Sequence, residues 1–462
     1  MTLSAIWRVL LTFGCLLIAA VWLAASEPER KSDLRPYWPQ FHGPRRDNRS
    51  DARGLLKRWP EDGPKLAWRA DAIGDGFASI SIADGAIYTA GNVEAQTVIT
   101  AIDLGGNKLW QTTSGPAFQG SFRGSRATPT FAAGNLYHQN GNGHLVCLRA
   151  EDGKLLWKLN TLEKFHGRQI RWGLAESVLI DGRRLICTPG GERVSMVALD
   201  RDTGETLWTC KREGDKPAYA SPILVEYGGL RQYITVMSKA AVGVHAETGR
   251  LLWRYEHEVA YDANCDTPVY HDGRIALFGT WGHGATCLQL NVDGNSCSVE
   301  EVWRNTDLDN EHGGVVLIDG YLYGQANGNR KDPHWACLEW ETGKTMYVAQ
   351  GLRDKSGTLT YADGMLYLLG DRRTVALMPP NPNRFEVVSQ FDLPTDVKGT
   401  SWARPVVCGG RLYIRYVDAL YAFDVRGSED GLRKFSVVTR FIGSGPREYV
   451  KDRMNAVTTN GR

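Results

Sequence analysis

The sequence has little net charge and no run of basic residues. Its 462 residues include 54 Lys and Arg against 52 Asp and Glu, which leaves a formal charge of +2. A protein that neutralises nucleic-acid phosphates needs a basic patch, with aromatic side chains interleaved where bases stack. The sequence shows no such pattern. We therefore expect no nucleic-acid partner.

Metal-binding cysteine motifs are also missing. The chain has nine cysteines but no Cys-x-x-Cys pair and no Cys/His spacing typical of a zinc site. Cys147, Cys287 and Cys337 recur at one place in a repeated strand, which predicts buried, small apolar side chains. Disulfide pairing stays open, and Cys287 with Cys297, on either side of a turn, is the local candidate.

One long apolar run is present, and it lies at the N-terminus. Arg8 precedes seventeen mostly apolar residues, Val9 to Ala25, and the sequence turns polar from Glu27. Small residues near Ser26 offer a cleavage site, which favours a signal peptide over residues 1–26. Seventeen residues is close to the lower limit for crossing a bilayer, so an uncleaved membrane anchor is the alternative. We expect an exported protein, either periplasmic or membrane-anchored and facing the periplasm.

The rest of the chain is built from a repeated phrase. A β-rich run, a two-residue turn, a second run, a strand of the type Ala-Leu-Asp, a Thr-Gly turn and Leu-Trp follow one another many times. Aromatic residues close the phrase at positions 68, 110, 157, 208, 253, 303 and 347, in steps of 42 to 51 residues. Steps of this length are typical of four-stranded propeller blades.

The two-residue turns give an independent count of the blades. Turns of the Asp-Gly, Gly-Gly or Gly-Asn type suit tight hairpins, because such residues adopt positive φ angles. They occur eight times between β-branched or aromatic runs, at residues 84–85, 134–135, 181–182, 228–229, 272–273, 319–320, 363–364 and 409–410.

The first and last copies of the phrase complement each other. The last copy has no Gly-Leu-Trp strand, whereas Lys65 to Trp68 form such a strand alone, before the first copy. We therefore predict an all-β, eight-bladed propeller over residues 65–425, with four-stranded antiparallel blades and a ring closed by an N-terminal strand. Residues 27–64 are predicted to be a linker and lead-in segment, and residues 426–462 a C-terminal extension. Each recurrent Trp is expected to pack on the adjacent blade, where Gly permits a close approach.

These repeats resemble the blade repeat of the PQQ-like (quinoprotein) β-propeller family, which includes quinoprotein alcohol dehydrogenases and the β-barrel assembly lipoprotein BamB. The resemblance covers residues 38 to 425. The opening Trp38-Pro39-Gln40-Phe41-His42-Gly43-Pro44 is similar to the start of exported bacterial members of the superfamily. The resemblance predicts the fold, but one fold can support both enzymes and scaffolds.

For an enzyme of this family, the resemblance implies several features. These are a disulfide between adjacent cysteines over pyrroloquinoline quinone (PQQ), a Trp beneath it, a calcium ion held by Glu, Asn and Asp, and an Asp base. This sequence has no adjacent cysteines, and it lacks the long insertions that cover the cofactor in the dehydrogenases. We therefore expect no cofactor and a non-catalytic binding or scaffold module for envelope proteins or peptides, of the BamB type. A PQQ- and calcium-dependent alcohol or sugar oxidoreductase is the alternative, and binding of polysaccharide or sulfated ligands is a third.

A site is expected where the innermost strands begin, because the residues before each of them point at one mouth of the central channel. Eight three-residue segments, or triplets, precede these strands and begin at residues 77, 126, 175, 219, 265, 312, 356 and 402. Most of them have a small residue in the middle, and Glu176 and Asp266 are the exceptions. The candidate channel-mouth residues are Arg126, Glu176, Asp266, His312, Lys355, Trp402 and Arg404.

Two interpretations of this group remain open. It could hold a small ligand or cofactor, or it could be a ring of mutually compensating salt bridges that plugs the pore. In an enzyme, Asp266 and His312 would be the catalytic pair, and Glu176 with Asp266 would bind calcium. Arg171-Trp172-Gly173 and Gly282-His283-Gly284 are further candidates in mouth loops, although glycines around His283 also suit an ordinary turn.

Overall fold

The computed structural model describes residues 36–211, 215–326, 334–352, 356–395 and 399–427. The predicted leader (residues 1–26), most of the predicted C-terminal extension and Lys355 lie outside these ranges. Within them, we find no helix with the length and apolar character needed to cross a membrane.

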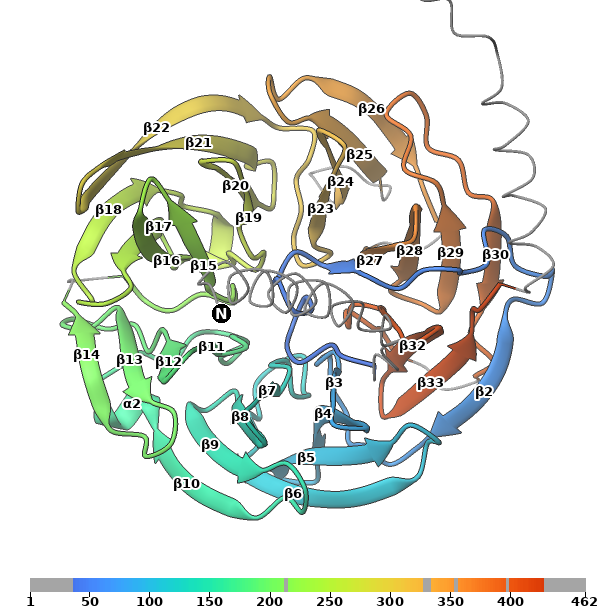
Figure 1. The fold of residues 1–462 in the computed structure, drawn as a ribbon, viewed down its shortest axis with the longest axis horizontal. Helices are drawn as coiled ribbons and strands as arrows, with labels where there is room; N and C mark the ends of the chain where they lie inside the picture. The colour runs from blue at the N-terminus through green and yellow to red at the C-terminus, as the bar shows by residue number, and fades with distance from the viewer. Residues whose placement is uncertain (1–35, 212–214, 327–333, 353–355, 396–398, 428–462) are drawn as a thin grey trace, which may run out of the picture. The chain divides into compact units, whose positions relative to one another are not determined.

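Eight antiparallel sheets follow one another around a ring (Figure 1). Seven are built from consecutive strands, so each blade is a local meander whose hairpins are set by the Asp-Gly and Gly-Gly turns. This confirms the predicted eight-bladed, all-β propeller.

Blade 1 contains β3 (Ser81–Ala83), β4 (Ala86–Val93), β5 (Gln96–Asp103) and β6 (Lys108–Pro116), and blade 2 contains β7 (Thr130–Ala132), β8 (Asn135–Gln139), β9 (His144–Arg149) and β10 (Leu155–Asn160). Blade 3 contains β11 (Leu179–Asp181), β12 (Arg184–Cys187), β13 (Met196–Asp200) and β14 (Thr206–Cys210), and blade 4 contains β15 (Ile223–Tyr227), β16 (Leu230–Val236), β17 (Ala240–His245) and β18 (Leu251–Glu256). Blade 5 contains β19 (Val269–His271), β20 (Arg274–Gly279), β21 (Gly284–Asp293) and β22 (Ser296–Asn305), and blade 6 contains β23 (Val315–Ile318), β24 (Tyr321–Ala326), β25 (His334–Glu339) and β26 (Thr345–Gln350). Blade 7 contains β27 (Gly357–Ala362), β28 (Met365–Gly370), β29 (Thr374–Met378) and β30 (Ser389–Asp392), and blade 8 contains β31 (Val406–Cys408), β32 (Arg411–Tyr416), β33 (Ala419–Asp424) and β2 (Lys65–Ala70). Two short helices, α2 (Thr161–Lys164) and η1 (Ala260–Asp262), lie in connections between blades.

The ring is closed as predicted. β2 is the outer strand of blade 8 and pairs antiparallel with β33. A buried arginine ties the same blade to blade 1, because Arg415 of β32 donates hydrogen bonds to the carbonyl of Gly74 (2.6 Å) and to Oγ1 of Thr89 (2.6 Å). Strand pairing and this side chain therefore both hold the two ends of the repeat together.

Outer-strand tryptophans link neighbouring blades. The indole Nε1 of Trp110 donates a hydrogen bond to the carbonyl of Ala150 in blade 2 (3.1 Å). A Cβ atom on Gly153 of that blade would lie 2.6 Å from the Trp110 ring, so only glycine permits this approach. The same bond to the next blade is made by Trp68, Trp157, Trp208 and Trp303.

Trp253 departs from this pattern. Its indole donates to Oε1 of Gln232 in its own blade, at 2.7 Å. In the next blade the outer hairpin is longer, since β21 ends only at Asp293 and β22 begins at Ser296. This hairpin therefore has no Thr-Gly turn at the place where the indole would otherwise pack. The insertion in the sequence therefore explains the exception.

The recurrent cysteines are buried, as predicted: Cys147, Cys287 and Cys337 have no exposed surface. None of the eight described cysteines, Cys147 to Cys408, forms a disulfide, so the candidate pair Cys287–Cys297 does not form. In the β21–β22 ladder Cys287 lies opposite Trp303, whereas Cys297 lies opposite residue 292. The two cysteines are therefore about 17 Å apart along the strand direction, far beyond the reach of a disulfide.

The lead-in segment, residues 36–64, is an integral part of the ring and crosses its centre (Figure 1, dark blue). Trp38 bridges to blade 1, and β1 (Arg49–Ser50) pairs in parallel with β27 of blade 7. Between these points the buried Arg46 donates to the carbonyls of Ser177 (3.1 Å) and Pro222 (2.8 Å) on blades 3 and 4. The segment therefore lies across the channel and is fixed to blades on both sides of it.

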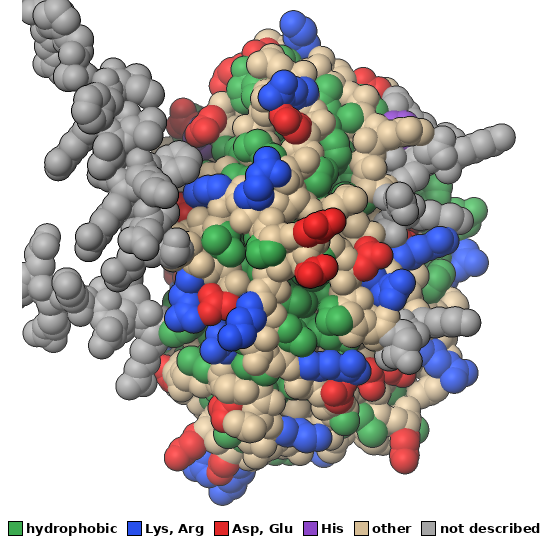
Figure 2. Space-filling view, turned by 90° about the vertical axis from the view of Figure 1, so that its right-hand side faces the viewer, with side chains coloured by type: hydrophobic (Ala, Val, Ile, Leu, Met, Phe, Trp, Pro, Cys, Tyr) green, Lys and Arg blue, Asp and Glu red, His purple; other side chains and the backbone are tan. Residues whose placement is uncertain are grey.

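Figure 2 shows one side of the ring, where positive and negative side chains alternate with hydrophobic ones. This face carries no patch of a single charge, in agreement with the small net charge of the sequence.

Candidate functional site

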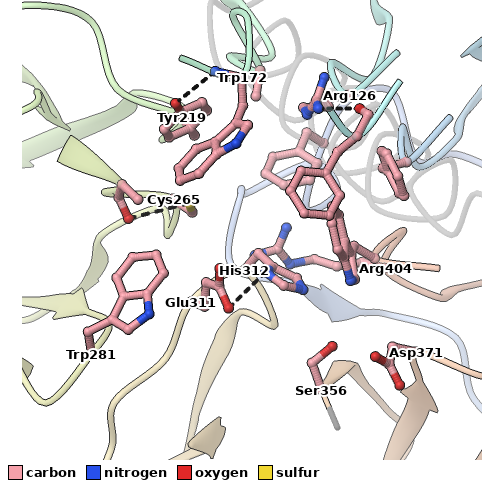
Figure 3. A pocket seen from close by; sticks show the side chains of 16 residues that line it. Arg126, Trp172, Tyr219, Cys265, Trp281, Glu311, His312, Ser356, Asp371 and Arg404 are labelled. Atoms are coloured by element: carbon pink, nitrogen blue, oxygen red, sulfur yellow. Dashed lines mark hydrogen bonds and ion pairs between the residues drawn. The ribbon is translucent and has the colours of Figure 1, made fainter. Parts of the chain in front are cut away.

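A cavity of about 430 Å³ lies at the open mouth, among the segments that precede the innermost strands (Figure 3). Every blade contributes one residue to its lining from the same place in the repeat. These residues are Phe77, Arg126, Ala175, Tyr219, Cys265, His312, Ser356 and Trp402. Each is the first member of a triplet that precedes an innermost strand in the sequence.

Most of the remaining lining is apolar. Phe41 comes from the lead-in segment, and Phe122, Trp172 and Trp281 come from mouth loops. Seven aromatic side chains in all face the cavity, which is the composition typical of a ligand-binding pocket with a few polar groups.

The wall formed by Trp402 is densely stacked. Its indole lies on the ring of Phe77, with centroids 4.4 Å apart and an interplanar angle of 22°. The His312 ring contacts it from 4.7 Å, and Nδ1 of His312 is 3.8 Å from the Glu311 carboxylate. Burial lowers the pKa of His312, so its imidazole is neutral at neutral pH.

Arg404 is held by a buried carboxylate. Its guanidinium lies 4.8 Å from the Phe41 ring centroid and donates to Asp266 at 3.0 Å. The Gly314 amide donates to the same oxygen at 3.2 Å. Burial raises the pKa of Asp266 to about 7, a rise that Arg404 and the Gly314 amide restrain. The carboxylate of Asp266 thus supports Arg404 from behind and does not line the cavity.

Arg126 lies on the wall formed by blade 2 and has no such partner. Its guanidinium donates to the backbone carbonyls of Ser121 (3.5 Å), Phe122 and Gly124 (3.2 Å). It also lies 5.7 Å from the centroid of the Phe77 ring. Burial lowers the pKa of Arg126 to about 10, which still leaves it charged at neutral pH. No carboxylate among the described residues contacts it.

Glu176 lies apart from the cavity. Its carboxylate accepts hydrogen bonds from the backbone amide (2.9 Å) and the hydroxyl of Thr188, and only 2% of the residue is exposed. Burial raises its pKa to about 7. Alternate residues of an extended chain point in opposite directions. The first member of a triplet therefore faces the channel, whereas a middle member such as Glu176 or Asp266 points into the wall of the ring.

Only some of the site residues predicted from the sequence line the cavity. Arg126, His312, Trp402 and Arg404 lie together around the cavity, and Trp172 of the mouth loops joins them. The calcium ligands proposed for an enzyme are not brought together at the mouth. Within the described ranges, no group of three or more His, Cys, Asp or Glu side chains could hold a metal ion.

The lining residues that sequence reasoning missed are Phe41, Phe122, Ala263, Trp281, Glu311 and Asp371. Trp281 directly precedes the Gly282-His283-Gly284 motif. That motif identified the mouth loop to which Trp281 belongs. His283 itself is used elsewhere, since its Nε2 lies 3.1 Å from Nδ1 of the buried His257.

Comparisons with known proteins agree with this architecture. A family model described as outer membrane protein assembly factor BamB matches residues 94–348. Among solved structures, BamB from Moraxella catarrhalis is similar with a TM-score of 0.56 and 12% identity, over 79% of this chain and 98% of that chain. Quinohemoprotein alcohol dehydrogenase from Comamonas testosteroni is similar with a TM-score of 0.60 and 14% identity, over 85% of this chain and 81% of that chain. A europium-containing methanol dehydrogenase gives a TM-score of 0.61 at 12% identity, over 82% of this chain and 89% of that chain.

Identities this low show a shared fold and no more. None of the curated proteins matches this chain. The family model, however, covers more than half of the sequence, from the first blade to the sixth. The chain therefore belongs to the PQQ-like repeat family described as outer membrane protein assembly factor BamB.

Proposed function

We propose that this chain is a non-catalytic binding module of the cell envelope, a scaffold of the BamB type that holds a protein or peptide partner at its open mouth. The observation that carries the proposal is the character of the cavity. Its walls carry seven aromatic side chains and two arginines beside Glu311 and Asp371, and the described residues bring no metal-ligating cluster to it. Such a surface is suited to hold a ligand by stacking and by charge.

The titratable groups at the mouth are poorly placed for catalysis. A general base must come within hydrogen-bond reach of the proton that it removes. Asp266 is 2% exposed and is bound to Arg404, so a substrate in the cavity cannot reach its carboxylate. His312 lies against Trp402. This arrangement favours binding over chemistry.

Export is part of the proposal and rests on the N-terminal sequence, since residues 1–26 lie outside the described ranges. A leader that is cleaved would release the propeller into the periplasm, and one that is retained would tether it to the membrane. Partners in the envelope follow from either route.

Cross-linking from the mouth tests the proposal. A photo-reactive amino acid at Phe122 would project from the mouth, whereas the same residue at Leu109 would project from the outer strand β6. The two positions are matched, with 54% and 53% of each residue exposed. We expect position 122 to capture an envelope protein in living cells and position 109 to capture none. Equal labelling from both positions would contradict a partner site at the mouth.

A PQQ-dependent alcohol or sugar oxidoreductase is the second candidate, favoured by the position of an aromatic cavity with two arginines at the channel mouth. Bound PQQ would supply the oxidant for such a reaction, and Arg126 and Arg404 would face its carboxylates. The fit is incomplete. Trp402 is already stacked on Phe77, and Glu176 does not line the cavity.

The two functions are separated by titration of the full chain with PQQ and calcium, followed by a dye-linked screen for alcohol and sugar oxidation. A binding module gives no dye reduction. Saturable PQQ binding with turnover, lost in Arg126→Gln, would replace the scaffold with the enzyme.

A further inference from the structure

Arg126 places an uncompensated positive charge on one wall of the mouth cavity. A guanidinium has five N–H donors. The contacts described above occupy three of them, all with backbone carbonyls. Arg404, the other arginine of the lining, is paired with Asp266 at 3.0 Å. A partly buried cation without a counterion favours an anionic ligand, because the ligand restores the interactions that burial removed.

Another part of the lining is aromatic. Figure 3 shows Tyr219 and Trp281 on the side of the cavity opposite Arg404, with Trp172 between Tyr219 and Arg126. Trp172 lies 5.7 Å from Tyr219 between ring centroids, and both are in contact range of the same cavity space. Aromatic side chains so arranged favour a flat ring, through stacked or edge-to-face contacts.

The rim of the cavity retains strained aromatic residues. Phe122, Tyr261 and Trp281 have φ angles of 54°, 63° and 57°, in the left-handed region that bulky residues avoid. Backbone strain of this kind clusters at ligand-binding sites. Phe122 and Trp281 line the cavity, and Tyr261 lies 5.3 Å from Trp281 between ring centroids. The strained aromatic residues and the charge of Arg126 therefore lie at the same mouth of the channel.

The position of the acidic side chains orients the ligand. Glu311 and Asp371 of the lining belong to blades 6 and 7, and blade 6 stands opposite blade 2 in a ring of eight. A negative group on the ligand is thus attracted to Arg126 and kept away from the opposite side of the cavity. The cavity, at about 430 Å³, lies near the small end of the range of about 300 to 1,000 Å³ for ligand pockets. One or two fused rings fit this space.

We propose that the mouth cavity binds an aromatic carboxylate, with the carboxylate on Arg126 and the ring against Trp172, Tyr219 and Trp281. The ligand is either a small aromatic acid or the C-terminal residue of a polypeptide that ends in an aromatic side chain. The proposal rests on the proposed binding function and names the chemistry of what is bound.

The test compares an acid with its uncharged amide. Indole-3-propionate and indole-3-propionamide are titrated separately into the full chain by calorimetry. A hydrogen bond to a charged group contributes about 1.5 to 3 kcal/mol. We therefore expect the acid to bind at least ten-fold more tightly than the amide. Arg126→Gln should remove this difference, and the matched exposed arginine in Arg168→Gln, which pairs with Glu192, should preserve it.

A second pair of probes identifies the source of the ligand. A short peptide ending in Phe with a free carboxylate is compared with the same peptide amidated. Preference for the free peptide alone would assign a polypeptide C-terminus, and binding of the small acid alone would assign a metabolite-sized ligand. Trp172→Leu should weaken the acid and the amide equally, because it removes ring contacts and leaves the charge in place.

Three results would overturn the proposal: equal affinity for acid and amide, an unchanged preference in Arg126→Gln, or no saturable binding of any probe at millimolar concentration. Circular dichroism and melting temperature establish that each variant is folded. Failure of this test leaves the cross-linking result from Phe122 unaffected, whereas PQQ turnover would overturn the scaffold function itself.

Discussion

The indole of Trp110 covers Gly153 of the next blade and donates its N–H to the carbonyl of Ala150 at 3.1 Å. Four more tryptophans make the same bond to the blade that follows them. At five of the eight steps around the ring, adjacent blades are thus joined by a large apolar contact and one directed hydrogen bond.

Gly153→Ala should destabilise the propeller by about 1 to 3 kcal/mol beyond the cost of its positive φ angle, because the new Cβ overlaps the Trp110 ring. Gly134→Ala is the matched control, since Gly134 has a similar φ of 78° but open space around its Cβ position. Urea unfolding measures both variants. Equal losses in the two would mean that the Trp110 contact is not tight.

Arg415→Met should destabilise the closed ring by about 2 to 5 kcal/mol, because buried acceptors such as the Gly74 carbonyl lose their donor. Arg426→Met is the control in the same blade, where an exposed arginine pairs with Asp424 and, because water screens the pair, contributes little to stability. Chemical denaturation followed by tryptophan fluorescence gives both values. Similar stabilities for the two variants would show that Arg415 is not needed for closure.

Glu176→Gln should stabilise the protein at pH 8 relative to pH 5. Burial raises the pKa of Glu176 to about 7 in the folded chain, whereas an unfolded Glu titrates near 4.3. Between these values the unfolded chain loses its proton first, so the contribution of this group to stability falls as the pH rises. The difference between variant and wild type should grow by up to about 3 kcal/mol from pH 4 to pH 8.

Exposed Glu205 in the same blade serves as the control for this pH dependence, since Glu205→Gln should change the unfolding free energy little at either pH. A pH profile of Glu176→Gln that runs parallel to the wild type would show that the carboxyl is ionised in the fold.

The cysteines of the propeller should all react as thiols once the protein is unfolded. The eight described cysteines, Cys147 to Cys408, form no disulfide, and seven of them are buried. Alkylation in denaturant without reductant, read by mass spectrometry, should therefore modify all eight. A pair that is modified only after reduction would reveal a disulfide and a local change of the fold around it.

The sequence allowed the fold to be predicted almost completely, because the same pattern of strands and turns occurs eight times along it. The Trp110–Gly153 contact and the closing strand β2 both follow from comparing copies. The site was predicted less well. Glu176 and Asp266 stood out by their charge, but one residue of register turns a side chain from the channel into the wall. Phe122 and Trp281 lie in irregular loops, where no period marks a residue as part of a site.

The lead-in segment also determines when the ring can be completed. Asn48 contacts Thr360 and Ser50 contacts Val407, across 312 and 357 residues of chain. Contacts between such distant residues form slowly, because the intervening chain must first be brought together. Asn48 and Ser50 are therefore synthesised before the blades, but their contacts can form only after blades 7 and 8 have been synthesised. Until then β33 has an open edge, on which a strand of another chain could pair in place of β2.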